Sequence, residues 1–222
     1  ILWQEVETAD LITSLKLEYK YKIFSILPKE YYTKVFPELT AIDQQKIIEN
    51  MSESDIAELL ENISPDDRTY FLESIPEEMS QKILKLLGSE EREIASWLLA
   101  YPEGSIGRMM TPEYIAIKPD WTVEEAFEYV RSNIEESETY TTIYVLDSKK
   151  TLIGSIAIRK LFFTDKNTLI SDIMNNCPYI SAYEDREEAV DIIKKYNLHS
   201  LAVVNDRHSM IGIVTIDDIF YV

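Results

Sequence analysis

The stretch SLAVVNDRHSMIGIVTIDDIF, residues 200–220, decides the fold of the second half of this chain. It contains two apolar runs that suit buried strands, separated by a polar turn and followed by a short run typical of a helix start. A stretch with the same order, TIYVLDSKKTLIGSIAIRKLFF, occupies residues 142–163, and its Gly154 aligns with Gly212. Each copy is therefore predicted to form a strand, a hairpin turn, a second strand and a helix.

The two copies also share what precedes these strands. In the first copy YIAIKP (residues 114–119) comes before WTVEEAFEYV (121–130), and in the second PYISAY (178–183) comes before DREEAVDIIKKY (185–196). Each of these pairs predicts a strand followed by a helix. We therefore expect a duplicated α/β unit, whose two small sheets are covered by helices and pack as a pseudo-twofold pair.

The first half of the chain follows a different pattern, with an apolar residue at every twelfth position. Most of these residues precede a helix start, and three starts are predicted to be capping boxes, in which a hydroxyl accepts from an N–H group and an aspartate reaches back. A helix of about two turns is unstable alone in water, so the helices must stack as an all-α superhelical solenoid. The repeating residues are Leu15, Leu27, Leu39, Met51, Ile63, Ile75, Leu87 and Leu99; the capping pairs are Thr40–Asp43, Ser52–Asp55 and Ser64–Asp67; the buried stripe is Ile47, Ile48, Leu59, Leu60, Phe71 and Leu72.

The composition limits the possible partners. The 222 residues include 40 acidic and 22 basic ones, for a net charge of −18. Such a surface repels nucleic acid and anionic membranes, and attracts divalent cations or basic partners. The single cysteine, Cys177, excludes an intrachain disulfide. No apolar run approaches the roughly 20 residues of a membrane-spanning helix. No nucleophile, general base and orienting group converge in the sequence, so the chain is predicted not to be an enzyme.

The order of these features resembles known families. The strand and helix order with its GIVTIDDI ending (residues 212–219) resembles the CBS domain, and two copies in tandem look like a CBS pair. The helical repeat and the junction YPEGSIGRMMTPEY (101–114) together resemble the MgtE family of magnesium channels. The resemblance implies an α plus α/β fold, with an MgtE N-terminal-type α-solenoid at residues 1–103, a first CBS domain at 104–168 and a second CBS domain at 169–222.

The same resemblance implies a function. The chain would be the Mg²⁺-sensing region of a magnesium channel at the cytoplasmic face of the membrane, homodimeric through its CBS pair, with the transmembrane part in the same full-length chain. Mg²⁺ would bridge the acidic faces of the solenoid and the CBS pair and favour a closed state, because Mg²⁺ prefers oxygen ligands. The implied metal ligands are Asp66, Asp185, Glu187 and Asp218, whereas the family's other acids fall on Lys34, Tyr70, Asn197 and Tyr221.

A plainer interpretation applies to the acids at residues 184–191, because acids in a first turn complement the helix dipole on a solvated face. On this interpretation the chain would be a structural helical adaptor, in which the acids serve solubility.

A second ligand is also implied. CBS domains that hold adenine nucleotides resemble the pattern G-x-x-[ST]-x-x-D, which the second copy keeps as Gly212, Thr215 and Asp218. The first copy has Ala157 and Lys160 at the last two positions, so at most one nucleotide such as ATP is expected per chain. The alternative function is therefore an adenine-nucleotide-sensing CBS module that regulates a partner. The competing structural interpretation is that Thr215 and Asp217 cap the final helix.

Overall fold

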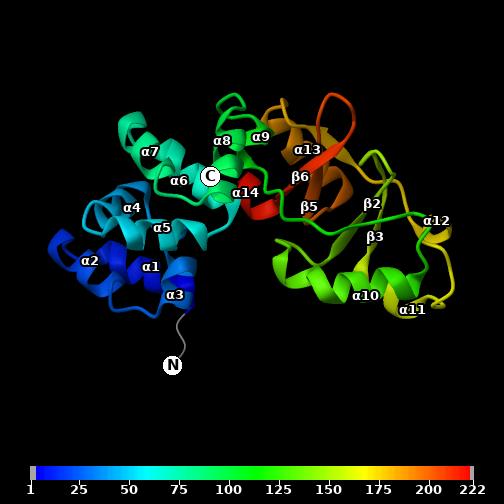
Figure 1. Ribbon diagram of the computed structural model, residues 1–222, viewed down its shortest axis with the longest axis horizontal. Helices are drawn as coiled ribbons and strands as arrows, with labels where there is room; N and C mark the ends of the chain where they lie inside the picture. Colours follow the sequence, from blue (N-terminus) through cyan, green and yellow to red (C-terminus); the bar gives the residue numbers. More distant parts are fainter. Residues whose placement is uncertain (1–3, 221–222) are drawn as a thin grey trace. The chain divides into compact units, whose positions relative to one another are not determined.

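The computed structural model describes residues 4–220. The chain divides into two compact units, Ile1–Ala100 and Tyr101–Val222. In Figure 1 the first unit consists of short stacked helices, and the second unit contains two small sheets with helices beside them. This is the predicted combination of a helical repeat and a duplicated α/β unit.

The first unit repeats with the predicted period. From α2 onward its helices begin at positions 17, 29, 41, 53, 65, 77 and 89, which are twelve residues apart. The predicted stripe residues are all buried, and the rings of Phe24, Phe36 and Phe71 continue the core, with centroids 6.1 Å apart for the first pair and 5.2 Å for the second. The helices are α1 (Glu5–Ser14), α2 (Leu17–Phe24), α3 (Lys29–Val35), α4 (Ala41–Ile48), α5 (Glu53–Glu61), α6 (Pro65–Ser74), α7 (Glu77–Leu84) and α8 (Ser89–Leu99).

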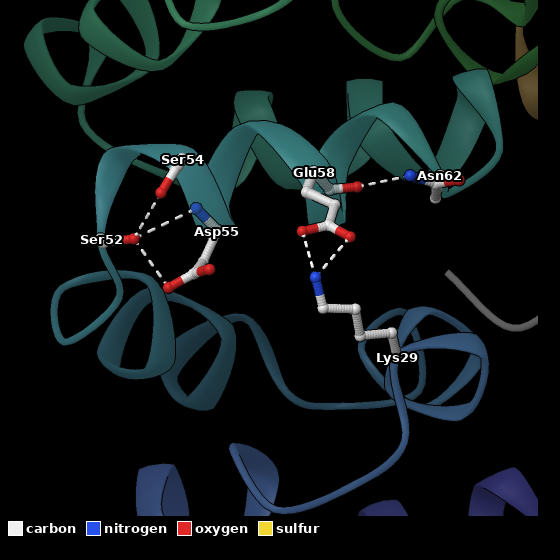
Figure 2. Close-up of polar contacts among 6 residues, drawn as sticks. All are labelled: Lys29, Ser52, Ser54, Asp55, Glu58 and Asn62. Carbon is white, nitrogen blue, oxygen red and sulfur yellow. Dashed lines mark hydrogen bonds and ion pairs between the residues drawn. The ribbon is translucent and has the colours of Figure 1, made fainter.

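The predicted caps form in part. The hydroxyls of Thr40, Ser52 and Ser64 each accept from the backbone N–H three residues on, as predicted. The carboxylate, however, does not complete the box at α5, because Asp55 accepts from the Ser52 hydroxyl at 2.7 Å rather than from its N–H (Figure 2). At α4 the Asp43 carboxylate instead binds Lys20 of α2 at 2.6 Å.

Figure 2 also shows how alternate helices of the repeat are joined at the surface. The Lys29 ammonium of α3 reaches Glu58 of α5 at 2.6 Å, and the Asn62 side chain closes the end of α5 on the Glu58 carbonyl at 2.7 Å. The two side chains of this ion pair are 66% and 43% exposed, so the bridge is expected to contribute little to stability.

The second unit contains two three-stranded sheets with the same topology, β1-β2-β3 and β4-β5-β6. In each sheet the first pair of strands is parallel and the second pair is an antiparallel hairpin. Both copies therefore have the predicted strand and helix order. The elements are β1 (Ala116–Ile117), α10 (Val123–Asn133), η1 (Ile134–Glu136), β2 (Thr142–Leu146), β3 (Leu152–Ala157), α11 (Ile158–Phe163), β4 (Tyr179–Ser181), α13 (Arg186–Tyr196), β5 (Ser200–Val204), β6 (Met210–Thr215) and α14 (Ile216–Phe220).

The segments that lead into the two copies are exchanged. The lead segment of the first copy, with α9 (Ile106–Met109), pairs with the second sheet through Thr111 and Ile213. The lead segment of the second copy, with α12 (Ile170–Ile173), pairs with the first sheet through Ser155 and Asn175. The stretch around residues 101–111, predicted only as a connection, is thus an ordered part of the second half.

This exchange explains the aligned glycines. A Cβ at Gly212 would lie 2.8 Å from the Thr111 carbonyl oxygen, and a Cβ at Gly154 would lie 2.8 Å from the Asn175 carbonyl oxygen. Only glycine lets the exchanged segment approach the strand so closely.

The two sheets also meet through their own side chains. The Tyr144 hydroxyl of β2 is 3.0 Å from the Ser200 hydroxyl of β5, and both side chains are buried. Burial raises the pKa of the Tyr144 phenol, with the Ser200 hydrogen bond acting in the opposite direction. The phenol therefore stays neutral and holds the two halves together through a buried hydrogen bond.

Candidate functional site

The start of α13 presents two of the predicted metal ligands. Asp185 is the N-cap of α13 and Glu187 lies in its first turn, and both are exposed. The loop before them is held by the exchanged segment, since the Ile106 N–H donates to the Glu184 carbonyl at 2.9 Å. Arg186, which lies between the two acids in the sequence, donates through Nε to the Ile219 carbonyl of α14 at 2.6 Å. The backbone that carries these acids is therefore fixed, while their carboxylates face solvent.

The start of α14 brings together the two predicted nucleotide contacts. Thr215 is buried at 7% exposure. The Asp218 carboxylate accepts from the Thr215 N–H at 3.2 Å and lies 2.5 Å from the Thr215 hydroxyl. The Asp217 carboxylate lies 2.5 Å from the same hydroxyl. A hydroxyl has one proton, so only one of the two carboxylates accepts it at a time.

These contacts bear on the capping interpretation. The N–H of Thr215 is capped by Asp218, three residues on, rather than by Asp217. The Thr215 hydroxyl and the Asp218 carboxylate therefore have a structural partner in each other at the start of α14.

The fourth predicted metal ligand belongs to the helical unit. Asp66 lies in the first turn of α6 and is buried. Asp185, Glu187 and Asp218 belong to the second unit. Within residues 4–220, no three His, Cys, Asp or Glu side chains form a group that could hold a metal ion.

The structure also shows where the residues lie that replace the family's other acids. Lys34 is exposed on α3, Tyr70 is exposed on α6, and Asn197 ends α13 in the left-handed conformation at φ 51°. Tyr221 lies outside the described residues. Asn197 tolerates this conformation better than most residues, which gives it a structural role at the helix end.

The first copy differs at the corresponding point. Ala157 and Lys160 stand where the second copy has Thr215 and Asp218, and the Lys160 ammonium donates to the Ile173 carbonyl of α12 at 2.5 Å. Sequence reasoning identified Lys160 only as a departure from a pattern. Its contact was not predictable, because α12 is too short to leave a periodic signal.

Two further observations concern the whole chain. Across residues 4–220 the structure has no helix that is long and apolar enough to cross a membrane. The sequence pattern of the MgtE intracellular N domain matches residues 3–104, and that of the CBS domain matches residues 106–164 and 170–222.

Known proteins share sequence similarity with part of the chain. The magnesium transporter MgtE of Thermus thermophilus is 35% identical over 140 residues, which are 63% of this chain and 31% of the relative. The chain therefore spans less than a third of that relative's length.

Solved structures extend the similarity to nearly the whole chain. The cytosolic domain of the Mg²⁺ channel MgtE in complex with ATP matches with a TM-score of 0.93 at 30% identity, covering 99% of this chain and 90% of that one. The soluble part of a magnesium transporter matches with a TM-score of 0.75 at 26% identity, covering 98% and 91%. The chain, an MgtE N domain followed by a pair of CBS domains, belongs to the MgtE family.

Proposed function

We propose that this chain is the Mg²⁺-sensing regulatory region of a magnesium channel or transporter. The observation that carries the proposal is the match, over nearly the whole chain, to the cytosolic domain of a Mg²⁺ channel. On this proposal the chain acts at the cytoplasmic face of the membrane, as a homodimer through its CBS pair, on a transmembrane part of the same full-length protein. It has no catalytic role of its own.

Mg²⁺ binding to acidic side chains supplies the regulation. The proposed ligands are Asp66, Asp185, Glu187 and Asp218. Two carboxylates about 4 Å apart repel by about 4 kcal/mol at an effective dielectric constant of about 20, and a shared cation offsets that repulsion. A site with a Kd of about 1 mM requires only about −4 kcal/mol, so a few hydrated carboxylate sites suffice. Occupied sites favour a compact, closed state, and empty sites an open one.

Small-angle scattering tests this mechanism. The protein is titrated with MgCl₂ through the millimolar range, against NaCl at matched ionic strength. Compaction specific to Mg²⁺ is expected, and Asp185→Asn with Glu187→Gln should weaken it. The matched control is Glu124→Gln, because Glu124 occupies the same place in the first turn of α10 without belonging to the proposed ligand set. A scattering profile that Mg²⁺ leaves unchanged contradicts the mechanism and favours the structural adaptor.

The replaced acid at Lys34 offers a gain-of-function test. Lys34 is exposed on α3, so a change of its charge is not expected to disturb the core. If its ammonium stands in place of an ion, Lys34→Glu should strengthen Mg²⁺ binding, measured as a lower Mg²⁺ midpoint in the same titration. An unchanged or higher Mg²⁺ midpoint contradicts the idea that the Lys34 ammonium stands in place of a bound ion.

ATP is the second proposed ligand. Thr215 and Asp218 lie together at the start of α14, and one of the similar solved structures is a complex with ATP. Calorimetric titration with ATP is expected to give binding that Thr215→Val or Asp218→Asn weakens. ATP binding without any response to Mg²⁺ would favour the alternative function, a nucleotide-sensing CBS module that regulates a partner.

A further inference from the structure

The connection that enters the CBS pair is held by Tyr101, the first residue of the second unit. Its ring covers Gly107, since a Cβ added there would lie 2.5 Å from the ring Cδ1 and 2.8 Å from Cδ2. Its carbonyl accepts from the Arg108 Nε–H at 2.7 Å, a bond strengthened by the charge of the donor. The ring of Tyr183 lies 5.4 Å away between centroids. These three contacts are the Tyr101 anchor.

The anchor acts on the Asp185 loop (residues 182–185), which leads into α13. Two N–H groups of the lead segment donate to carbonyls of this loop, namely Ile106 to Glu184 at 2.9 Å and Gly107 to Ala182 at 2.8 Å. Tyr183 lies between these two acceptors in the sequence, and its ring meets that of Tyr101. The backbone bonds and the aromatic pair therefore hold the same short loop.

The other half of the CBS pair shows that docking of a lead segment does not need such an anchor. Its lead segment makes the same two backbone bonds, Ile170 to the Trp121 carbonyl at 2.8 Å and Ser171 to the Pro119 carbonyl at 2.9 Å. Ser171 stands where Gly107 does, and Asp165 stands where Tyr101 does. Gly107 has no positive φ either. The glycine is therefore required by the ring that covers it, and not by the backbone.

Only one residue separates the anchor from the helical unit. The helix α8 ends at Leu99, and Ala100 is its exposed C-cap residue. A displacement of the chain at Ala100 therefore acts directly on Tyr101, and through the Tyr101 ring on the Asp185 loop.

We propose that Tyr101 is a positioning residue, which links the connection from α8 to the Asp185 loop and keeps that loop ordered for cation binding. This inference deepens the proposed function, because it rests on Mg²⁺ binding at Asp185 and Glu187. It adds a reciprocal coupling: an ordered connection strengthens Mg²⁺ binding at the loop, and bound Mg²⁺ in turn favours the ordered connection.

A double-mutant cycle tests the anchor without any ligand. Gly107→Ala alone should lower the thermal midpoint by a few degrees, because the new methyl group would displace the Tyr101 ring. In the Tyr101→Ala background the same substitution should cost much less, because no ring covers the position. Tyr101→Phe keeps the ring and should keep the full sensitivity to Gly107→Ala. Additive effects of Gly107→Ala and Tyr101→Ala would overturn the anchor.

Hydrogen exchange and the Mg²⁺ scattering titration test the positioning role. In Tyr101→Ala, exchange at the amides of Ile106 and Gly107 should become faster by about fivefold, as for the loss of one aromatic contact. The Mg²⁺ midpoint should rise by up to the same factor, because part of the binding free energy then orders the loop. Tyr101→Phe should restore both values.

The matched control is Tyr129→Ala, which removes an aromatic contact from the corresponding loop of the first half. The Tyr129 ring packs on that of Trp121 with centroids 5.2 Å apart, and the Trp121 carbonyl accepts from the lead segment of that half. This variant should change neither exchange at Ile106 nor the Mg²⁺ midpoint.

The outcomes separate this inference from the proposed function. If the chain responds to Mg²⁺ and Tyr101→Ala leaves the Mg²⁺ midpoint unchanged, or if Tyr129→Ala has an equal effect, the positioning role is overturned. If the unaltered chain does not respond to Mg²⁺, the proposed function fails, and the double-mutant cycle and the exchange experiment alone decide whether Tyr101 holds the Asp185 loop.

Discussion

At the scale of single residues, the ion pair between Lys20 and Asp43 is the contact whose loss should destabilise the helical unit most. The ammonium lies 2.6 Å from the carboxylate, and the two side chains are only 12% and 5% exposed. Asp43→Ala would leave a buried charge without its partner, so we expect a loss of about 3–5 kcal/mol in the free energy of unfolding of the helical unit. Urea denaturation followed by circular dichroism measures it.

The control and the rescue separate two causes of this loss. Lys46→Ala breaks the surface ion pair between Lys46 and Glu49, whose side chains are 40% and 36% exposed. This variant should change the urea midpoint little. The double variant Lys20→Met, Asp43→Leu should recover most of the stability, because it removes both charges. A double variant as unstable as Asp43→Ala would mean that lost packing, and not a buried charge, causes the effect.

Local sequence signals predicted residues whose partners are close in the chain. The hydroxyls of Thr40, Ser52 and Ser64 cap the helices as expected, since a cap acts within one turn. The partner of Asp43 was not predictable, because Lys20 lies two helices away and meets it only through stacking. The contact of Lys160 with Ile173 depends in the same way on the exchange of lead segments.

At the scale of elements, the exchanged lead segments depend on the two aligned glycines. In Gly212→Ala the new methyl group would lie 2.8 Å from the Thr111 carbonyl oxygen and 2.9 Å from the Met110 sulfur. We expect a loss of about 1–3 kcal/mol, typical of an overpacked site, which a lower thermal midpoint of the CBS pair would report.

Gly88→Ala serves as the comparison for this variant. Its added methyl group would meet chiefly the flexible carboxylate of Glu91, at 2.6 Å, which can move aside. It should therefore cost much less than Gly212→Ala. Equal stability of the two variants would show that the approach of the lead segment does not depend on Gly212.

Element types followed from the sequence wherever the periodic signal was long enough. The helices of the repeat and the hairpins of both copies were predicted, because apolar spacing and turn residues define them. The four-residue helices α9 and α12 were not. A single turn leaves no period in the sequence, and these turns form by docking on the sheet of the other half.

At the scale of the whole molecule, the net charge of −18 predicts a response to salt. Self-repulsion opposes the folded state, and it is screened when the Debye length falls from about 30 Å in about 10 mM NaCl to about 8 Å in about 150 mM NaCl. The thermal midpoint should therefore rise over this range, and equally with KCl. A falling midpoint would show that attractive ion pairs outweigh the repulsion.

The candidate site was predictable only in part at this scale. The sequence places Asp185 and Glu187 at a helix start, and the fold confirms that position. Which carboxylates share an ion depends on tertiary arrangement, and Asp66 belongs to the other unit. The ligand set came from family resemblance rather than from local physics, and it stays a prediction.

The exchange of lead segments also has a consequence for synthesis of the chain. Thr111 pairs with Ile213, so it must wait for about 100 further residues, which take roughly 5–20 s at typical rates of translation. Until then Met110 and its neighbours have no strand to cover, whereas the first sheet can already receive its own exchanged segment through Ser155 and Asn175. The last step in closing the CBS pair is therefore expected to come late, after the strand that contains Ile213 has emerged.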